Sequence, residues 1–155
     1  MSDTTLAENS EEEQQTTSRF LTFTSDNLVF GVSTDHVIEI ITNYMIRPLP
    51  MVPDYIRGII NLRGQIIPIM DMRLKLGKPF MEYTSSTCII ILEIDSIHIG
   101  IAVDSVLQVQ NINTVLASPI PIENRQELTN LMLSLEDGTV VLLLDCEAIV
   151  RGSSL

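Results

Sequence analysis

The sequence predicts a mainly β protein built from two related small β units, with short helical segments. Short apolar runs rich in β-branched residues recur along the 155-residue chain, and turn residues separate them at regular spacing. This pattern is typical of small barrels. Segment 31–40 also resembles segment 100–109 at an offset of 69, and segment 64–71 resembles segment 138–145 at an offset of 74. Two echoes in the same order indicate an internal duplication.

The first unit is predicted to begin with a hairpin and a short helix. Arg19–Thr24 and Leu28–Val32 have the composition of strands, and Ser25-Asp26-Asn27 between them favours a turn. A helix is expected over Asp35–Ile41, capped by the preceding Ser or Thr, because three of its apolar residues would share one face. The three prolines between residues 48 and 53 then predict an extended loop.

A second hairpin is predicted around a glycine turn. Ile59–Leu62 and Ile66–Met70 flank Arg63-Gly64-Gln65. Because glycine reaches positive φ at low cost, the chain is expected to turn at Gly64 and to hold Arg63 away from the apolar faces. Pro68 has no N–H, so its strand is expected to lie at a sheet edge or to carry a bulge.

The rest of the chain is predicted to repeat this scheme. Asp71–Leu76 is expected to be a helical turn that ends at Gly77. Three strands should follow, and then a proline-bearing loop at Ala117–Asn124 and a final hairpin. The predicted strands of this half are Cys88–Ile94, Ile97–Val103, Val106–Ile112, Asn130–Leu135 and Thr139–Leu144.

Composition divides the chain into three parts. Residues 1–17 are polar and acidic, with too little apolar content to fold, and are expected to be a disordered tail. Residues 18–150 should form a single domain of two β subdomains, and residues 151–155 a flexible C-terminus. The N-terminus has no basic or apolar leader, and charges interrupt the richest apolar stretch, Cys88–Val103. These features predict a cytoplasmic protein without direct membrane insertion.

The charge distribution restricts the choice of partner. The net charge is −11 and the sequence pI is about 4.4. Nucleic acid is therefore not expected, because phosphate binding needs clustered Lys and Arg. The region 47–78 nevertheless carries six Lys or Arg residues against two Asp residues. Two interpretations stay open: a chance excess on a solvated face, or a basic surface for an acidic protein partner.

Catalytic and metal-binding patterns are not expected. His36 and His98 are isolated from any Cys or His at ligand spacing, so neither a metal nor a cofactor is predicted. Asp71, Asp104 and Asp145 each follow an apolar run. They are expected to accept backbone N–H bonds at strand ends rather than to form a catalytic set.

The stretch from Pro53 to Arg73 carries a specific signature. It reads Pro-x-Tyr-Ile-Arg-Gly-Ile-Ile-Asn-Leu-Arg-Gly-x-Ile-Ile-Pro-Ile-x-Asp-x-Arg, which closely resembles the signature of CheW, the adaptor family of bacterial chemotaxis. The regulatory domain of the histidine kinase CheA and the amino-terminal half of CheV share this signature. The resemblance extends from about Phe20 to Ile149. It implies a CheW-like fold of two packed five-stranded SH3/OB-like β-barrels, with strand exchange between the barrels left open.

The same resemblance implies a non-catalytic adaptor that couples the cytoplasmic tips of methyl-accepting chemoreceptors to CheA. Arg63 and Asn61 are the expected direct contacts: Arg can pair with a receptor carboxylate, whereas Asn61 could instead hold its loop through backbone bonds. An enzyme or a small-molecule barrel, such as a flavin-binding one, is the alternative. The residues matching the family's receptor- and kinase-binding positions are Val37, Glu39, Ile40, Gly58, Asn61, Arg63, Gly64, Gly100, Val103, Val106 and Val109.

Overall fold

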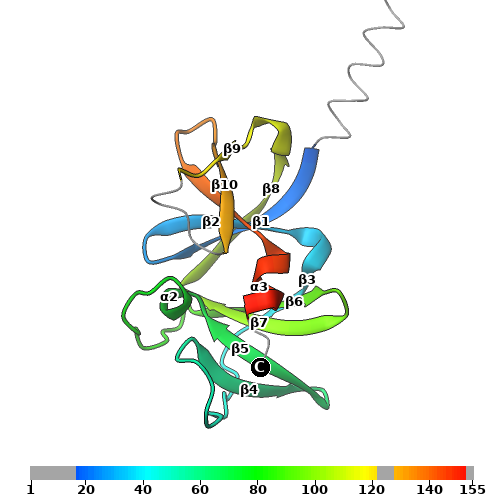
Figure 1. The fold of residues 1–155 in the computed structure, drawn as a ribbon, viewed down its shortest axis with the longest axis vertical. Coiled ribbons are helices and arrows are strands. Elements are labelled where there is room, and N and C mark those ends of the chain that lie inside the picture. The colour runs from blue at the N-terminus through cyan, green and yellow to red at the C-terminus, as the bar shows by residue number, and fades with distance from the viewer. Residues whose placement is uncertain (1–16, 122–127, 153–155) are drawn as a thin grey trace, which may run out of the picture.

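The β-branched runs pair into two small sheets in the computed structural model of the chain, which describes residues 17–121 and 128–152. The protein is therefore mainly β, as predicted, and Figure 1 shows one sheet above the other. Of the predicted tail only Thr17 is described, and it begins a strand. The other tail residues, residues 122–124 of the predicted loop and residues 153–155 lie outside the described part.

The first sheet, called sheet A, has six strands in the order β8-β1-β2-β11-β10-β9. Neighbouring strands are antiparallel except β2 and β11, which run parallel. Phe20, Ile112, Val141 and Leu143 form a buried cluster within this sheet. The strand bounds are β1 Thr17–Ser25, β2 Leu28–Ser33, β8 Ser105–Asn113, β9 Ser118–Pro119, β10 Thr129–Ser134 and β11 Val140–Leu144.

The second sheet, called sheet B, has five strands in the order β3-β6-β7-β5-β4. Its one parallel pair is β5 with β7. It has its own buried cluster, which includes Ile41, Ile60, Ile69 and Ile91. The strand bounds are β3 Val37–Ile41, β4 Ile56–Leu62, β5 Gln65–Asp71, β6 Cys88–Ile94 and β7 Ile97–Val103.

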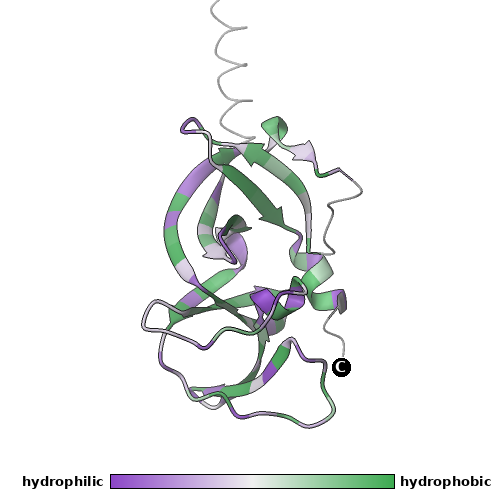
Figure 2. Ribbon diagram, turned by 90° about the vertical axis from the view of Figure 1, so that its left-hand side faces the viewer, coloured by the Kyte–Doolittle hydropathy of each residue, from purple (hydrophilic) through white to green (hydrophobic). Residues whose placement is uncertain are grey.

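A third and larger apolar cluster joins the two sheets. Phe23 and Phe30 of sheet A stack with ring centroids 5.5 Å apart, and they share this cluster with Met70 and Ile90 of sheet B. Figure 2 shows hydrophobic residues along the strands of both halves. Each strand order has two ends, so the described strands do not close into the full barrels that the family resemblance implied.

The two halves of the duplication are interleaved. Hairpin β1–β2 of the first half lies in sheet A between strands of the second half, and hairpin β6–β7 lies in sheet B between strands of the first half. Gly31 pairs with Leu143 and Gly100 pairs with Ile69. These pairs are equivalent under the two sequence offsets. The echoes therefore correspond to structural repeats that exchange a hairpin.

The predicted helix over Asp35–Ile41 is wrong. Only a 3-10 turn, η1 (Thr34–His36), forms there, and Ser33 Oγ accepts from the Asp35 N–H at 3.3 Å. The next five residues form β3 and pair with β6. Four of them are β-branched, a composition that favours a pleated surface, and the pairing with β6 buries Ile41. Long-range pairing therefore overrides the local helical spacing.

Pro68 does not mark an edge strand, because β5 lies between β7 and β4. Its opposite residue, Ile59, exchanges both backbone hydrogen bonds with Arg47, at 2.8 and 2.9 Å. On the other side, β7 pairs with β5 only from Ile69 onward. The ladder therefore needs no N–H from Pro68. The irregularity of this hairpin lies in β4, where the register shifts between Ile56 and Gly58.

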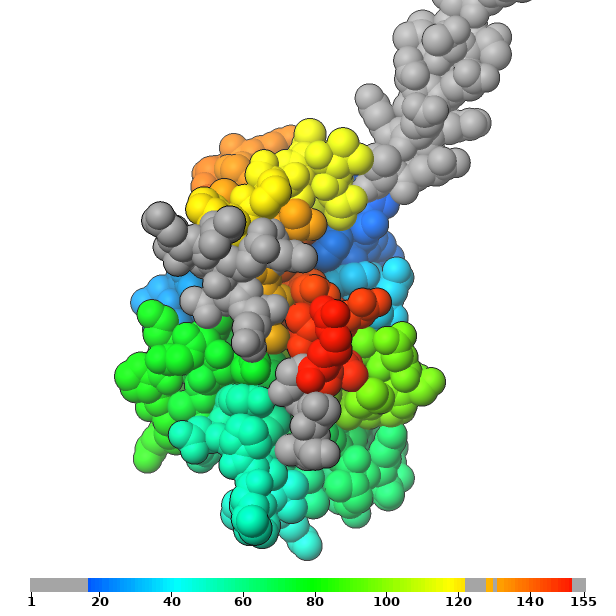
Figure 3. All heavy atoms as spheres, viewed as in Figure 1, coloured from blue at the N-terminus to red at the C-terminus, as the bar shows by residue number. Residues whose placement is uncertain are grey.

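Two short α-helices follow equivalent aspartates, which accept backbone N–H bonds as predicted. α2 (Met72–Lys75) follows Asp71, whose Oδ1 accepts from the Leu74 N–H at 3.0 Å. α3 (Cys146–Gly152) follows Asp145, whose Oδ1 accepts from the Ala148 N–H at 3.3 Å. Sequence reasoning missed α3, which Figure 3 shows in red on the surface. No helix in the described part is long and apolar enough to cross a membrane.

Candidate partner-binding surface

Arg63 and Gly64 form the two-residue turn between β4 and β5. Both have positive φ, 53° and 87°, as in the type I′ turns that match the twist of a hairpin. The Gly64 N–H donates to Asn61 Oδ1 at 2.8 Å. Asn61 therefore holds this loop, one of its two predicted roles. It is also exposed at the end of β4, where a partner can reach it.

Arg63 projects from the turn and pairs with Glu39 of β3. Its Nη1 and Nη2 atoms donate to the two Glu39 carboxylate oxygens at 2.6 and 3.0 Å, a bidentate geometry. The Arg63 side chain is 71% exposed. Because β3 and β4 are the edge strands of sheet B, the pair joins the turn that follows one edge strand to the other edge strand. Exposed ion pairs add little stability, so its main effect is to orient Arg63.

The electrostatics of this pair keep both partners charged near neutral pH. The hydrogen bond from Arg63 lowers the pKa of Glu39, and the same bond raises the pKa of Arg63. Tyr44 makes a smaller contribution to the raised pKa of Arg63. The surface thus presents an oriented cation bonded to a carboxylate.

The segment after β3 is fastened to β4. The two backbone bonds between Arg47 and Ile59 hold it there. Gly58 makes this approach possible, because it has a φ of 140° and a Cβ in its place would collide with the Arg47 carbonyl oxygen. Gly58 is buried, so its contribution to the predicted site is to let this segment lie on β4.

The remaining predicted residues are divided between the two sheets. Gly100 and Val103 are buried in β7, and a Cβ on Gly100 would lie 2.6 Å from Ile69 Cδ1. Val37 in β3 and Val106 in β8 are half-buried against the cluster that joins the sheets. Ile40 in β3 and Val109 in β8 are exposed. The structure therefore brings together the residues around Arg63 and Glu39, while the β8 residues lie in the other sheet.

Arg73, within the basic region 47–78, forms ion pairs with other residues of the same chain. Its side chain is 14% exposed and donates to both carboxylate oxygens of Asp104 at 3.0 and 2.8 Å. It also donates to Asp26 at 3.0 Å, and Lys78 lies 3.7 Å from the same carboxylate. This network ties α2 to the β1–β2 turn, so it connects sheet B to sheet A.

Two more cations of this region lie over aromatic rings. The Arg57 guanidinium is 4.1 Å from the centre of the Phe80 ring, and Lys75 Nζ is 4.1 Å from the centre of the Tyr55 ring. Much of the positive charge between residues 47 and 78 therefore has a structural partner. Arg47, by contrast, is exposed beside the Asn61 loop.

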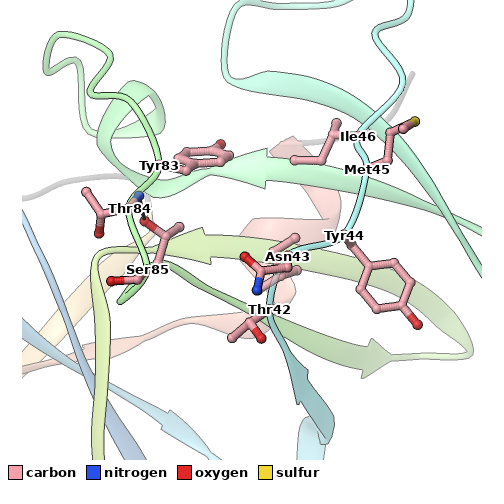
Figure 4. A pocket seen from close by; sticks show the side chains of 10 residues that line it. Thr42, Asn43, Tyr44, Met45, Ile46, Tyr83, Thr84 and Ser85 are labelled. Carbon is pink, nitrogen blue, oxygen red and sulfur yellow. Dashed lines mark hydrogen bonds between the residues drawn. The ribbon is translucent and has the colours of Figure 1, made fainter.

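The structure adds Tyr44 and Met45, which sequence reasoning missed. Tyr44 lines three hollows of about 640, 260 and 420 Å³. Figure 4 shows the largest, with Tyr83, Thr84 and Ser85 on one side; the Tyr44 ring points away from these residues. The second hollow lies between Tyr44 and Asn61. The left-handed Asn43, with a φ of 59°, turns the chain just before Tyr44. A solvent-exposed Tyr-Met pair in a proline-rich loop carries no motif by which it could be recognised.

The described residues contain no group of three or more His, Cys, Asp or Glu residues that could hold a metal ion. The 640 Å³ hollow is lined by neutral side chains, several with hydroxyl or amide groups. Most of the charged groups described above are instead paired on the surface or between elements. An exposed, oriented guanidinium near exposed Tyr and Met side chains is an arrangement suited to contact with another protein.

Comparisons with known proteins give a consistent result. The family model described as CheW-like domain matches residues 19–154. The chain is 34% identical over 102 residues to the chemotaxis protein CheW of Klebsiella aerogenes, which covers 66% of this chain and 61% of that protein. It is 30% identical over 140 residues to CheW of Thermotoga maritima, in an alignment that covers 84% of this chain and 86% of that protein.

A solved structure shares the fold. The scaffolding protein TtCheW from Thermoanaerobacter tengcongensis superposes with a TM-score of 0.77 at 26% identity, which covers 83% of this chain and 88% of that one. The family model, the sequence relatives and the solved structure agree, and the chain belongs to the CheW-like domain family.

Proposed function

We propose that this chain is a non-catalytic chemotaxis adaptor that works in the cytoplasm and couples chemoreceptor cytoplasmic tips to the histidine kinase CheA. Family membership supports the adaptor class. The observation that carries the proposal is the Arg63–Glu39 pair, which holds an exposed guanidinium in a fixed direction on a type I′ turn. A guanidinium is well suited to bidentate recognition of a carboxylate.

The rigidity of this surface supports the same role. The turn is held by the Asn61 bond, and the neighbouring segment is held by the Arg47 and Ile59 bonds. A partner that docks here meets groups that are already ordered, so little conformational entropy is lost on binding. The exposed Ile40 on β3 adds apolar area beside the charged pair. How the site residues divide between receptor and kinase belongs to this proposal as well.

The flavin-type alternative receives no specific support. A flavin-binding barrel would need an anion site for the flavin phosphate, which basic residues of the region 47–78 could supply. None of the basic residues of that region lines the 640 Å³ hollow. Purification with a bound chromophore, or a thermal shift with a flavin, would favour this alternative.

A three-component binding experiment tests the proposal. The full chain is titrated with a soluble chemoreceptor cytoplasmic fragment, with CheA, and with both together. We expect binding to each partner separately and a complex that contains all three. Absence of binding to both partners would overturn the adaptor proposal. Binding of receptor and kinase in strict competition would remove the coupling role.

A further inference from the structure

We infer that the 260 Å³ hollow between the Tyr44–Met45 segment and the β4–β5 hairpin, called the Tyr44 pocket below, receives one apolar side chain from an acidic segment of the receptor tip. In the same contact, Arg47 pairs with a carboxylate of that segment. This inference rests on the proposed function and specifies the chemistry of the receptor segment.

The position of the pocket connects it to the predicted site. Asn61 lines it, and Asn61 also bonds to Gly64 in the Arg63 turn. Tyr44 lines it too. A partner bound at the charged pair would therefore lie directly beside the pocket. The lining residues are Tyr44, Met45, Arg47, Ile59, Ile60, Asn61 and Ile66.

Two of the side chains that line the pocket are exposed apolar groups. Met45 is 79% exposed and Ile66 is 56% exposed, and both lie on segments held by backbone pairing. Clustered exposed apolar side chains rimmed by polar groups mark interaction surfaces. Tyr, Met and Arg are also the residue types enriched in protein interfaces. The volume suits one apolar side chain rather than a large ligand.

The pocket is already formed before any partner binds. Arg47 is fixed by its two backbone bonds to Ile59, and Gly58 allows this close approach. The type I′ turn fixes the opposite wall, where Ile66 lies near the start of β5. Because both walls are held by backbone geometry, an inserted side chain loses little affinity to ordering of the protein.

Charge complementarity selects an acidic partner segment. The chain has a net charge of −11, so an acidic segment is repelled by the chain as a whole and needs a basic site to bind. Arg47 lines the pocket and is exposed, and Arg63 lies two residues beyond Asn61, which also lines the pocket. An acidic segment is therefore attracted to this part of the surface and disfavoured elsewhere. A segment with an apolar side chain next to a carboxylate can fill the pocket and pair with Arg47 at the same time.

The test compares two methionines of the same loop. Met45 lines the pocket, whereas Met51 is 102% exposed and lines none of the three hollows around Tyr44. Met45→Glu, Met51→Glu and the wild-type chain are titrated with the receptor fragment and with CheA. We expect Met45→Glu to bind the receptor fragment at least about tenfold more weakly. Met51→Glu should stay within about twofold of wild type, and all three proteins should share one unfolding midpoint.

A charge-reversal pair tests the second part of the contact. Arg47→Glu should weaken receptor binding, and a Glu→Lys change in the receptor fragment should restore it for that variant only. Equal receptor affinity of Met45→Glu and wild type would overturn the inference. The proposed function would still stand in that case, because the wild-type chain would bind the receptor fragment. A loss confined to CheA would also overturn it. A wild-type chain that binds no receptor fragment would remove both the inference and the proposed function.

Discussion

Single residues with unusual backbone conformations build the candidate site. Arg63 and Gly64 need positive φ to make the tight turn, and Asn43 needs it to redirect the chain before Tyr44. Gly58 combines a φ of 140° with a contact that no side chain could tolerate. The sequence predicts the turn at Gly64. It does not reveal that Gly58 allows another segment to lie on β4, because that depends on a partner 11 residues away.

Substitution of Gly58 should therefore cost more than substitution of an ordinary turn glycine. In Gly58→Ala, a strained φ combines with a collision against the Arg47 carbonyl, so we expect the free energy of unfolding to fall by about 2–5 kcal/mol. Gly77→Ala is the matched control, because Gly77 has a φ of 79° but open space around it. It should cost about 1–2 kcal/mol. Equal losses in denaturant titrations would contradict the close-approach explanation.

Tyr83 offers a prediction about pH. Its hydroxyl donates to Oδ2 of the buried Asp71 at 2.8 Å; partial burial of Tyr83, which is 39% exposed, and then this bond raise the pKa of its phenol. The folded state therefore favours the protonated phenol. Its contribution to stability is present below about pH 10, the ordinary tyrosine value, and is lost as the pH rises toward the raised pKa.

Tyr83→Phe removes this titrating group and is the variant to compare. At neutral pH we expect a loss of about 1.5–3 kcal/mol, because the missing hydrogen bond is made to a buried carboxylate. Above pH 10, the stability of the wild type should fall more steeply than that of the variant. Chemical denaturation at several alkaline pH values measures both effects. Parallel stability curves for the two proteins across this range would show that Tyr83 titrates normally.

Elements that are set by local composition were predicted correctly, and elements that are set by pairing with a distant strand were not. The strands at Cys88–Ile94 and Ile97–Val103 have the predicted bounds, because turn residues limit two apolar runs. Residues 37–41 fit both a helical face and a strand, and the choice depended on pairing with β6. The exchange of hairpins could not be deduced, since an internal repeat does not say which copy a strand joins. α3 lay just beyond the recognised echo.

Equivalent residues of β5 and β11 should contribute about equally to the free energy of unfolding. Ile69 and Leu143 are both buried, each beside the glycine of its partner strand. Ile69→Ala and Leu143→Ala should each lower the free energy of unfolding by about 2–5 kcal/mol. Ile66→Ala is a control, because Ile66 is exposed in the same strand. Unchanged unfolding midpoints in both core variants would contradict the claim that Ile69 and Leu143 are equivalent buried core residues.

In the whole molecule, the candidate site depends on how loops meet at one end of sheet B. The family signature led to Arg63, Asn61 and Gly58, and the structure places all three near one another. Tyr44 and Met45 could not be found from the sequence, because their position depends on the Arg47 bridge and the Asn43 turn. Gly100 and Val103 were expected at the site by resemblance, and they are buried in β7. Whether they affect partner binding stays a prediction.

Coupling by the assembled protein is expected to depend on the direction in which Arg63 presents its charge. Arg63→Glu replaces an exposed cation that supports little of the core, so the fold should persist with an unchanged unfolding midpoint. The reversed charge should repel a receptor carboxylate and weaken receptor binding at least about tenfold. The double variant Glu39→Arg/Arg63→Glu restores an ion pair with the opposite direction, and it separates a partner contact from a purely internal one.

The most direct test of the adaptor role is receptor-coupled activation of CheA in a reconstituted complex with each variant. We expect activation with the wild type, and loss of activation with both Arg63→Glu and the double variant while each remains folded. Activation at the wild-type level with Arg63→Glu would contradict the assignment of this surface to coupling. Recovery in the double variant would show that Arg63 acts through Glu39 and not through the receptor.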